Sequence, residues 1–151
     1  MKVTNILKTI VMTLLMVSTC LIVSIVQAQV KSATAEEVAT AKALVGFIRA
    51  KTDMTPSEQE EMWKKFEGKK VVFKGTVRTV GTSVAGKFYV SLTVGRIGWF
   101  ENLNIQFNVP RHLRGTVAMW DIGETHVMRG IISGWGDLKD DAVCSDAEIV
   151  E

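Results

Sequence analysis

Cysteine is scarce in this sequence, and its positions exclude a fold that depends on internal disulfides. Of 151 residues, only Cys20 and Cys144 are cysteines. Cys20 lies inside an apolar N-terminal run, so Cys144 is the one thiol in the rest of the chain, and one cysteine closes no internal disulfide. We expect Cys144 to act as a small buried hydrophobic residue, with an intermolecular bridge as the alternative.

Histidine is equally scarce, and the sequence lacks the usual signatures of enzymes. The two histidines, His112 and His126, are not at metal-ligand spacing from each other or from Cys144. No nucleophile-elbow, zinc-protease or phosphate-loop motif occurs. Three aspartates between positions 137 and 141 form a cluster, but it lacks the spaced oxygen ligands and the glutamate of a calcium loop. The sequence therefore predicts no catalytic site, no metal and no other cofactor.

A clear surplus of positive charge, which a general polyanion binder needs, is also missing. The whole chain has 18 lysines and arginines against 16 acids. Lys2 and Lys8 precede every acid, so residues 29–151 contain 16 charges of each sign. The charge is uneven, with ten cations and two acids in residues 64–114 and two cations and eight acids in residues 115–151. This pattern predicts a dipolar molecule.

The N-terminal 28 residues are typical of an export signal. A basic start precedes Ile10–Val26, an apolar run of 17 residues without charge, and Val26-Gln27-Ala28 fits a small-residue cleavage site. We therefore expect residues 1–28 to be a signal peptide and the protein to be periplasmic or secreted.

Two other fates of this segment remain open. The apolar run is long for a signal and close to the lower limit of about 17–25 residues for a membrane-spanning helix, so an uncleaved membrane anchor is the alternative. Lipidation of Cys20 is disfavoured because Thr19 precedes it and because the apolar run continues to Val26. All three fates place the rest of the chain across the membrane.

Residues 29–67 are predicted to form a helical segment. Apolar residues recur at helical spacing over Ala35–Ala50, which indicates an amphipathic helix. A second helix is predicted over Pro56–Phe66, because Thr55 can cap it, proline suits its first position and Glu58 can close a capping box.

From Gly68 onward, apolar residues alternate with polar ones, which indicates β-strands. In the first strand, Val71, Phe73 and Val77 point to one side, and Gly75 between them suggests a bulge or a sharp bend. The predicted elements are strands over Gly68–Gly81, Lys87–Val94, Asn102–Val109, Thr125–Ile132 and Ala142–Val150, with a short helix within Arg111–Trp120.

The order β-β-β-α-β-β matches the OB-fold, a small, partly open five-stranded barrel that binds oligonucleotides or oligosaccharides across strands two and three. The predicted fold class is therefore mainly β. The predicted organisation is a signal peptide over 1–28, two helices over 29–67 and an OB-fold barrel over 68–151.

Four segments carry a resemblance to a known family: WKKFEGKKVVFKGTV, KFYVSL, GETHVMRGIISGW and DAEIVE. Together they resemble the bacterial secreted OB-fold families of the tRNA-anticodon-like type, over about Met62–Glu151. The shared positions are small or apolar, so the resemblance implies a fold more than an activity. Members are mostly envelope proteins, and the family name implies a fold relationship to nucleic-acid binders.

Cations, amides and aromatic residues are predicted on the outside of this barrel and in its loops. Such side chains suit stacking on, and polar capture of, an oligomeric ligand. They also have a structural interpretation, since polar residues cover outer strand faces and lysines at strand edges oppose aggregation. The candidate ligand-binding residues are Lys74, Arg78, Lys87, Tyr89, Trp99, Asn104, Gln106 and Trp135.

These observations predict a non-catalytic binding module of the cell envelope. We expect it to recognise a glycan, a peptide or a protein partner through the outer face of strands one to three. One alternative is single-stranded nucleic acid or another oligoanion in the same groove, which the fold and the basic middle favour. Zero net charge after export and a single exposed strand aromatic, Tyr89, oppose it. The other alternative is a membrane-tethered interaction protein.

Overall fold

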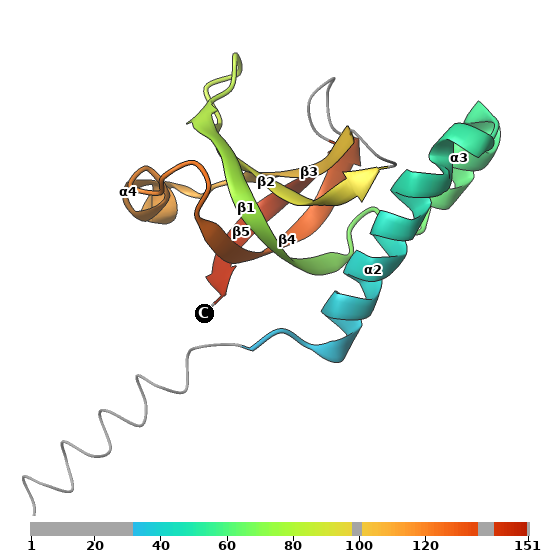
Figure 1. Ribbon diagram of the computed structural model, residues 1–151, viewed down its shortest axis with the longest axis horizontal. Helices are drawn as coiled ribbons and strands as arrows, with labels where there is room; N and C mark the ends of the chain where they lie inside the picture. The colour runs from blue at the N-terminus through green and yellow to red at the C-terminus, as the bar shows by residue number, and fades with distance from the viewer. Residues whose placement is uncertain (1–31, 98–100, 136–140, 151) are drawn as a thin grey trace, which may run out of the picture. The chain divides into compact units, whose positions relative to one another are not determined.

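The computed structural model describes residues 32–97, 101–135 and 141–150, and Ala33–Glu151 form one compact unit. The predictions for residues 1–31 lie outside the described residues. Within the described part, no helix is long and apolar enough to cross a membrane. The elements, shown in Figure 1, are α2 (Ala35–Ala50), α3 (Pro56–Lys64), β1 (Lys70–Thr82), β2 (Phe88–Ile97), β3 (Glu101–Asn108), α4 (Arg114–Val117), β4 (Thr125–Trp135) and β5 (Ala142–Val150).

Both N-terminal helices begin at capping boxes. Thr34 and Glu37 close the box of α2, whose bounds agree with the prediction. Thr55 and Glu58 close the predicted box of α3. The second helix ends at Lys64, two residues earlier than predicted, because the chain turns there toward Gly68, which has φ +78°.

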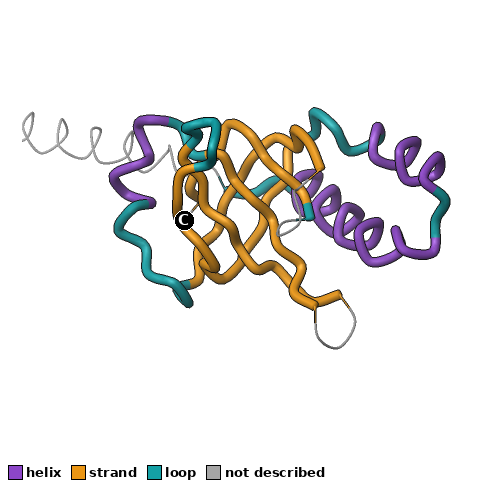
Figure 2. Tube along the Cα trace, turned by 90° about the horizontal axis from the view of Figure 1, so that it is seen from above, coloured by secondary structure: helices purple, strands orange, loops and turns teal. Residues whose placement is uncertain are grey.

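The five strands form a closed barrel in the order β1-β2-β3-β5-β4, which confirms the predicted fold class. Neighbouring strands are antiparallel except β3 and β5, which pair in parallel over Ile105–Phe107 and Ala142–Cys144. Figure 2 shows α2 and α3 on one side of the barrel and the short helical segment containing α4 on the other.

The first strand, β1, pairs with two neighbouring strands. Its pairing also corrects the predicted position of the bulge. It pairs with β4 over Lys70–Thr76 and with β2 over Thr76–Thr82. The irregularity in register lies between Val77 and Thr79, so the bulge is at Arg78 and not at Gly75. Gly75 is required for close approach, because a Cβ there would lie 2.8 Å from the carbonyl oxygen of Thr93.

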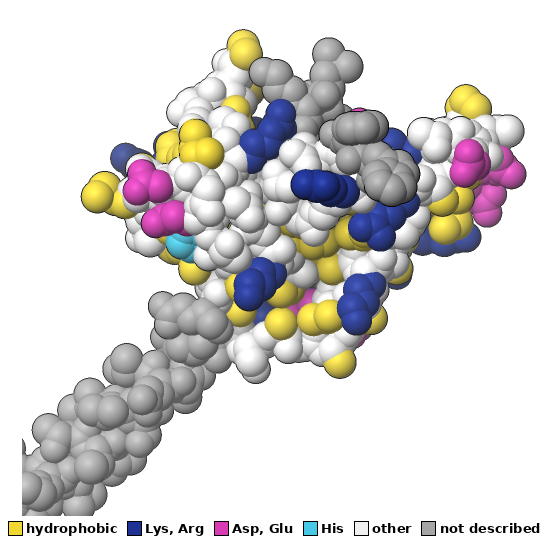
Figure 3. Space-filling view, viewed as in Figure 1, with side chains coloured by type: hydrophobic (Ala, Val, Ile, Leu, Met, Phe, Trp, Pro, Cys, Tyr) yellow, Lys and Arg dark blue, Asp and Glu magenta, His cyan; other side chains and the backbone are white. Residues whose placement is uncertain are grey.

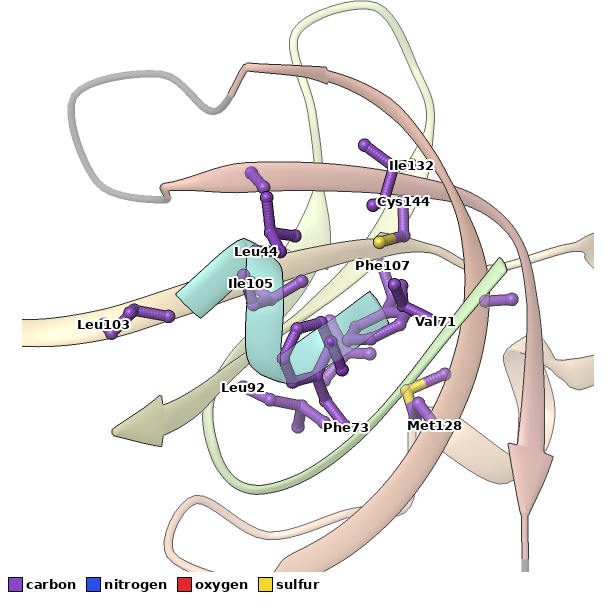
Figure 4. Packing of buried hydrophobic residues seen from close by; sticks show 14 of the residues in the cluster. Leu44, Val71, Phe73, Leu92, Leu103, Ile105, Phe107, Met128, Ile132 and Cys144 are labelled. Atoms are coloured by element: carbon purple, nitrogen blue, oxygen red, sulfur yellow. The ribbon is translucent and has the colours of Figure 1, made fainter. Parts of the chain in front are cut away.

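One hydrophobic core joins the barrel to the N-terminal helices. Val71, Phe73 and Val77 of β1 are buried, as the alternation predicted. One face of α2, which includes Leu44, belongs to the same buried cluster as Phe107 and the other barrel residues (Figure 4). The helix is therefore an integral part of the folded unit.

Candidate ligand-binding groove

A groove of about 400 Å³ lies between α2 and the first half of β1. We call it the α2–β1 groove. Figure 3 shows a hydrophobic hollow in this region with lysine and arginine side chains around it. Its apolar lining comes from two elements of the barrel and from α2, namely Val38, Ala41, Val45, Val72, Phe73 and Val94.

All charged residues that line the α2–β1 groove are positive. Lys42 and Arg49 come from α2, and Lys74 comes from the outer side of β1. All three side chains are exposed, so they reach solvent at the margin of the groove. Because the lining contains no Asp or Glu within the described part of the chain, a carboxylate that enters the groove meets only attractive charges.

The position of α2, and therefore the shape of the groove, is fixed at the C-terminal end of the helix. Arg49 Nε donates to the backbone carbonyl of Arg96, 3.2 Å away on β2. A Cβ on Gly95 would lie 3.5 Å from Arg49 Nη2, so the guanidinium lies over this glycine. Just beyond the helix, Lys51 Nζ lies 3.3 Å from Asp141 Oδ1. These contacts hold one cation of the groove in place before any ligand binds.

A buried ion-pair network fixes the other end of α2. Arg129 of β4 is only 4% exposed. Its Nε lies 2.9 Å from Glu37 Oε1, and its Nη1 donates to Glu148 Oε2 at 3.1 Å. Burial raises the pKa of Glu37, but hydrogen bonds from the Thr34 backbone N–H and from Arg129 outweigh it and hold the pKa below its ordinary value.

Gly46 is exposed in the middle of α2 and lines the groove. Glycine in a helix interior is less stable than alanine by about 1 kcal/mol, so its presence needs a reason. A Cβ at Gly46 would have no neighbour within 4 Å, which excludes crowding as the reason. The missing side chain leaves the groove wider at this point.

One edge of β1 opens toward the groove. Over Lys70–Gly75 this strand pairs with β4, whereas its pairing with β2 begins only at Thr76. Among the described residues, no strand is paired with the other edge of Lys70–Gly75, although β2 packs against Gly75 at the end of this segment. Val72 and Lys74 of this segment line the groove. We call Lys70–Gly75 the open edge of β1.

Of the seven candidate residues that the structure describes, only Lys74 lines the groove. Arg78, Tyr89 and Gln106 lie half-buried on the adjoining strands. The ring of Tyr89 lies beside Gly81, where a Cβ would be 3.5 Å from its hydroxyl oxygen. Gln106 Nε2 donates to Asn108 Oδ1 at 3.1 Å.

Asn104 was expected on the outer surface, but it is only 6% exposed. Its Oδ1 accepts a hydrogen bond from Thr93 Oγ1 at 2.8 Å. Its backbone N–H donates to Asp141 Oδ2, and its carbonyl accepts from the Asp141 N–H at 2.7 Å. In this structure Asn104 therefore ties β3 to the start of β5.

Of the remaining three candidates, two lie away from the groove lining and one lies outside the described residues. Lys87 lines a smaller pocket of about 220 Å³ beside Arg114 and Asp146. Trp135 stacks on Trp63 of α3 with ring centroids 4.3 Å apart. Trp99 lies outside the described residues.

Sequence reasoning missed Lys42, Arg49 and Gly46, all on α2. The prediction treated this helix as an amphipathic element and assigned no ligand contact to it. Two features of α2 could have indicated a binding surface on this helix. One is a glycine in mid-helix, and the other is the pair Val38 and Val45, which lie seven residues apart beside the core-facing stripe. Neither feature identifies the strand that lies opposite.

The His126 and Cys144 side chains lie outside the lining of the groove. The described residues contain no group of three or more His, Cys, Asp or Glu side chains that could hold a metal ion. Burial raises the pKa of the Cys144 thiol to about 12, so it is a poor nucleophile. His126 stacks on Trp120 and lies 3.1 Å from Glu124, away from the groove lining.

Comparison with known proteins supplies no family. No protein-family model and no curated protein matches the sequence. Among solved structures, a lipoprotein from Klebsiella pneumoniae to which nucleic-acid binding is ascribed aligns with 58% of this chain and 75% of its own, at 18% identity and a TM-score of 0.44. OBody AM3L15, solved bound to hen egg-white lysozyme, aligns with 58% and 80%, at 22% identity and a TM-score of 0.40.

Similarities this low transfer no ligand to this chain. The OB-fold assignment therefore rests on the strand order of the barrel itself. The resemblance to the tRNA-anticodon-like type stays a prediction.

Proposed function

We propose that this chain is an exported, non-catalytic binding module that holds a peptide or protein partner in the α2–β1 groove and on the adjoining outer face of β1–β3. The α2–β1 groove is the observation that carries the proposal. Its apolar walls can bury side chains, and its three cations can pair with carboxylates. Its volume lies within the range of about 300–1,000 Å³ that is common for ligand sites.

The lining favours a peptide over a glycan. None of the groove's lining residues has a carboxylate, amide or hydroxyl side chain. A sugar ring that packs against the valines and Phe73 would leave the hydroxyl groups on that side without hydrogen-bond partners, which costs several kcal/mol in an apolar site, roughly 2–7. Apolar side chains of a peptide have no such cost.

The same lining supports a non-catalytic role. Its ionisable groups are two lysines and one arginine, and all three side chains are exposed. General acid–base or nucleophilic catalysis needs a positioned base beside a nucleophile. The buried thiol of Cys144 and the His126–Glu124 pair lie outside this lining.

An oligoanion is the second candidate, and one feature favours it. Arg78 stands at the bulge of β1, on the strand that also carries Lys74 to the groove. Against it, Tyr89 lies against Gly81 and is only half-exposed, so it offers little stacking surface. Binding of an oligothymidylate that falls steeply between about 50 and 200 mM salt would support this candidate.

The envelope location is part of the proposal and is supported by the sequence of residues 1–28. A cleaved signal gives a free periplasmic or secreted module, and an uncleaved segment gives a tethered one. Both forms present the same groove. Cell fractionation with the intact mass of the product distinguishes them.

The test compares three ligand classes on the exported product. A displayed random-peptide library, a glycan array and an oligothymidylate are screened against the wild type and against Gly46→Phe, whose ring would enter the groove. Gly46→Ala is the matched control, because it adds only a methyl group. We expect peptides that bind the wild type and Gly46→Ala but not Gly46→Phe. Glycan or oligothymidylate binding without such peptides would contradict the proposal.

A further inference from the structure

We propose that the occupant of the α2–β1 groove is an acidic peptide in extended conformation, which lies along the open edge of β1. This inference rests on the proposed function and names the ligand class of the same site. It follows from three independent features: the strand edge, the distribution of charge and the spacing of apolar side chains.

The open edge of β1 offers backbone hydrogen bonds. In a strand, alternate backbone N–H and C=O groups point to opposite edges, so part of those of Lys70–Gly75 point away from β4. β2 packs against Gly75 but forms no strand pairing with Lys70–Gly75, since its pairing with β1 begins at Thr76. Six residues span about 20 Å, enough for a short extended peptide to add as a further strand.

The cations are spread along the groove instead of gathered at one point. Lys42 and Arg49 stand seven residues apart on α2, which is about 10 Å along the helix axis. Lys74 faces them from β1. A ligand with one anionic head group, such as a fatty acid, can satisfy only one of these positions. A peptide with several carboxylates can satisfy them all.

Apolar contacts are available between the cations. Val38 and Val45 lie on α2, and Val72 and Val94 lie on the two strands. An extended peptide directs every second side chain to the same side. Val72 and Lys74 lie on the same face of β1, two positions apart. A peptide that carries an apolar and an acidic residue on the same side, two positions apart, can therefore meet both.

The lysines of the open edge give this site selectivity. Lys70 and Lys74 are exposed on the edge segment itself. Lysine on a strand edge repels other strands and deters aggregation. An incoming acidic strand is attracted instead of repelled. The lysines therefore disfavour basic and neutral peptides at this edge and favour acidic ones.

Peptide selection against charge-reversed protein tests the inference. The exported product and its Lys42→Glu/Lys74→Glu variant are used to select from the same random-peptide library. Lys64→Glu is the control, because Lys64 lies on α3 and is not part of the groove lining. We expect the wild type and the control to select acidic peptides that also contain apolar residues. The double variant should bind those peptides at least about tenfold more weakly.

Backbone hydrogen exchange tests the extended mode with the selected peptides. We expect slower exchange of the amides within Lys70–Gly75 when the peptide is bound. Protection confined to α2 would overturn the extended mode. Self-association of the protein alone that Gly46→Phe abolishes would identify a second copy as the occupant and overturn the inference.

The outcomes also separate this inference from the proposed function. Neutral or basic peptides that bind the wild type and the double variant equally, yet are blocked by Gly46→Phe, would overturn the acidic class and leave the binding groove intact. Peptides that bind Gly46→Phe as well as they bind the wild type would overturn both.

Discussion

Gly75 and Gly46 differ in the space that surrounds them. At Gly75 a side chain has no room, because a Cβ would lie 2.9 Å from Leu92 Cβ and 2.8 Å from a backbone carbonyl oxygen. At Gly46 a side chain has ample room, and the glycine costs helix stability. The first is explained by packing in the barrel. The second has no packing reason, and it leaves the α2–β1 groove wider than a larger side chain would.

Gly75→Ala should therefore destabilise the barrel. The added methyl group forces β1 and β2 apart, and overpacking of this kind costs about 1–3 kcal/mol. Gly134→Ala in β4 is the control, since a Cβ there meets nothing within 4 Å. Chemical denaturation measures both. Equal stabilities of the two variants would contradict the close approach at Gly75.

Cys144 should be unreactive in the folded protein. The side chain is fully buried, and its raised pKa of about 12 leaves almost no thiolate at neutral pH. In a Cys20→Ser background, we expect a thiol reagent to label Cys144 only after denaturant is added. Rapid labelling of the native protein would show that the thiol is exposed.

Glu37 should make stability depend on pH. Its folded pKa lies below the ordinary value of 4.5, so its contribution is present above that value and is lost as pH falls through the folded pKa. Glu37→Gln should lower stability by about 1–3 kcal/mol at neutral pH, because hydrogen bonds to a charged partner weaken. The two proteins should converge in acid. Parallel pH–stability curves would contradict this role.

At the scale of elements, local patterns predicted most of the fold. The bounds of α2, the capping box of α3 and the inward residues of β1 depend on periodicity and on residues three positions apart, which a sequence displays directly. The groove depends on how α2 lies against β1, and no local pattern contains that contact. The burial of Asn104 likewise depends on Asp141, which is distant in sequence.

Trp135, the last residue of β4, packs against the N-terminal helices. The sequence suggested a ligand contact, which stays a prediction. The structure stacks this ring on Trp63, places it 5.5 Å from the Phe47 ring centroid and leaves it 39% exposed. Trp135→Ala should lower stability by about 1–3 kcal/mol, because it removes the contact of α3 with β4. Peptide affinity for the groove should stay within about twofold.

Thermal unfolding and peptide titration of Trp135→Ala distinguish a packing role of this ring from a ligand contact. Lost affinity with unchanged stability would support the role suggested by the sequence.

At the scale of the whole molecule, an OB-fold barrel carries an added helical wall. Closure of the barrel leaves few free strand edges, and the open edge of β1 is where α2 approaches. The basic middle of the sequence and α2 both contribute to the cationic margin of the groove. The barrel thus supplies rigidity, and the helix supplies the second wall of the site.

The most direct measurement of this account is the affinity of one selected peptide for three proteins: the wild type, Gly46→Ala and Gly46→Phe. We expect the wild type and Gly46→Ala to bind within about threefold of each other, while Gly46→Ala gains about 1 kcal/mol of stability from its better helix propensity. Gly46→Phe should fold normally and lose binding. Full binding by folded Gly46→Phe would show that the α2–β1 groove is not the binding site.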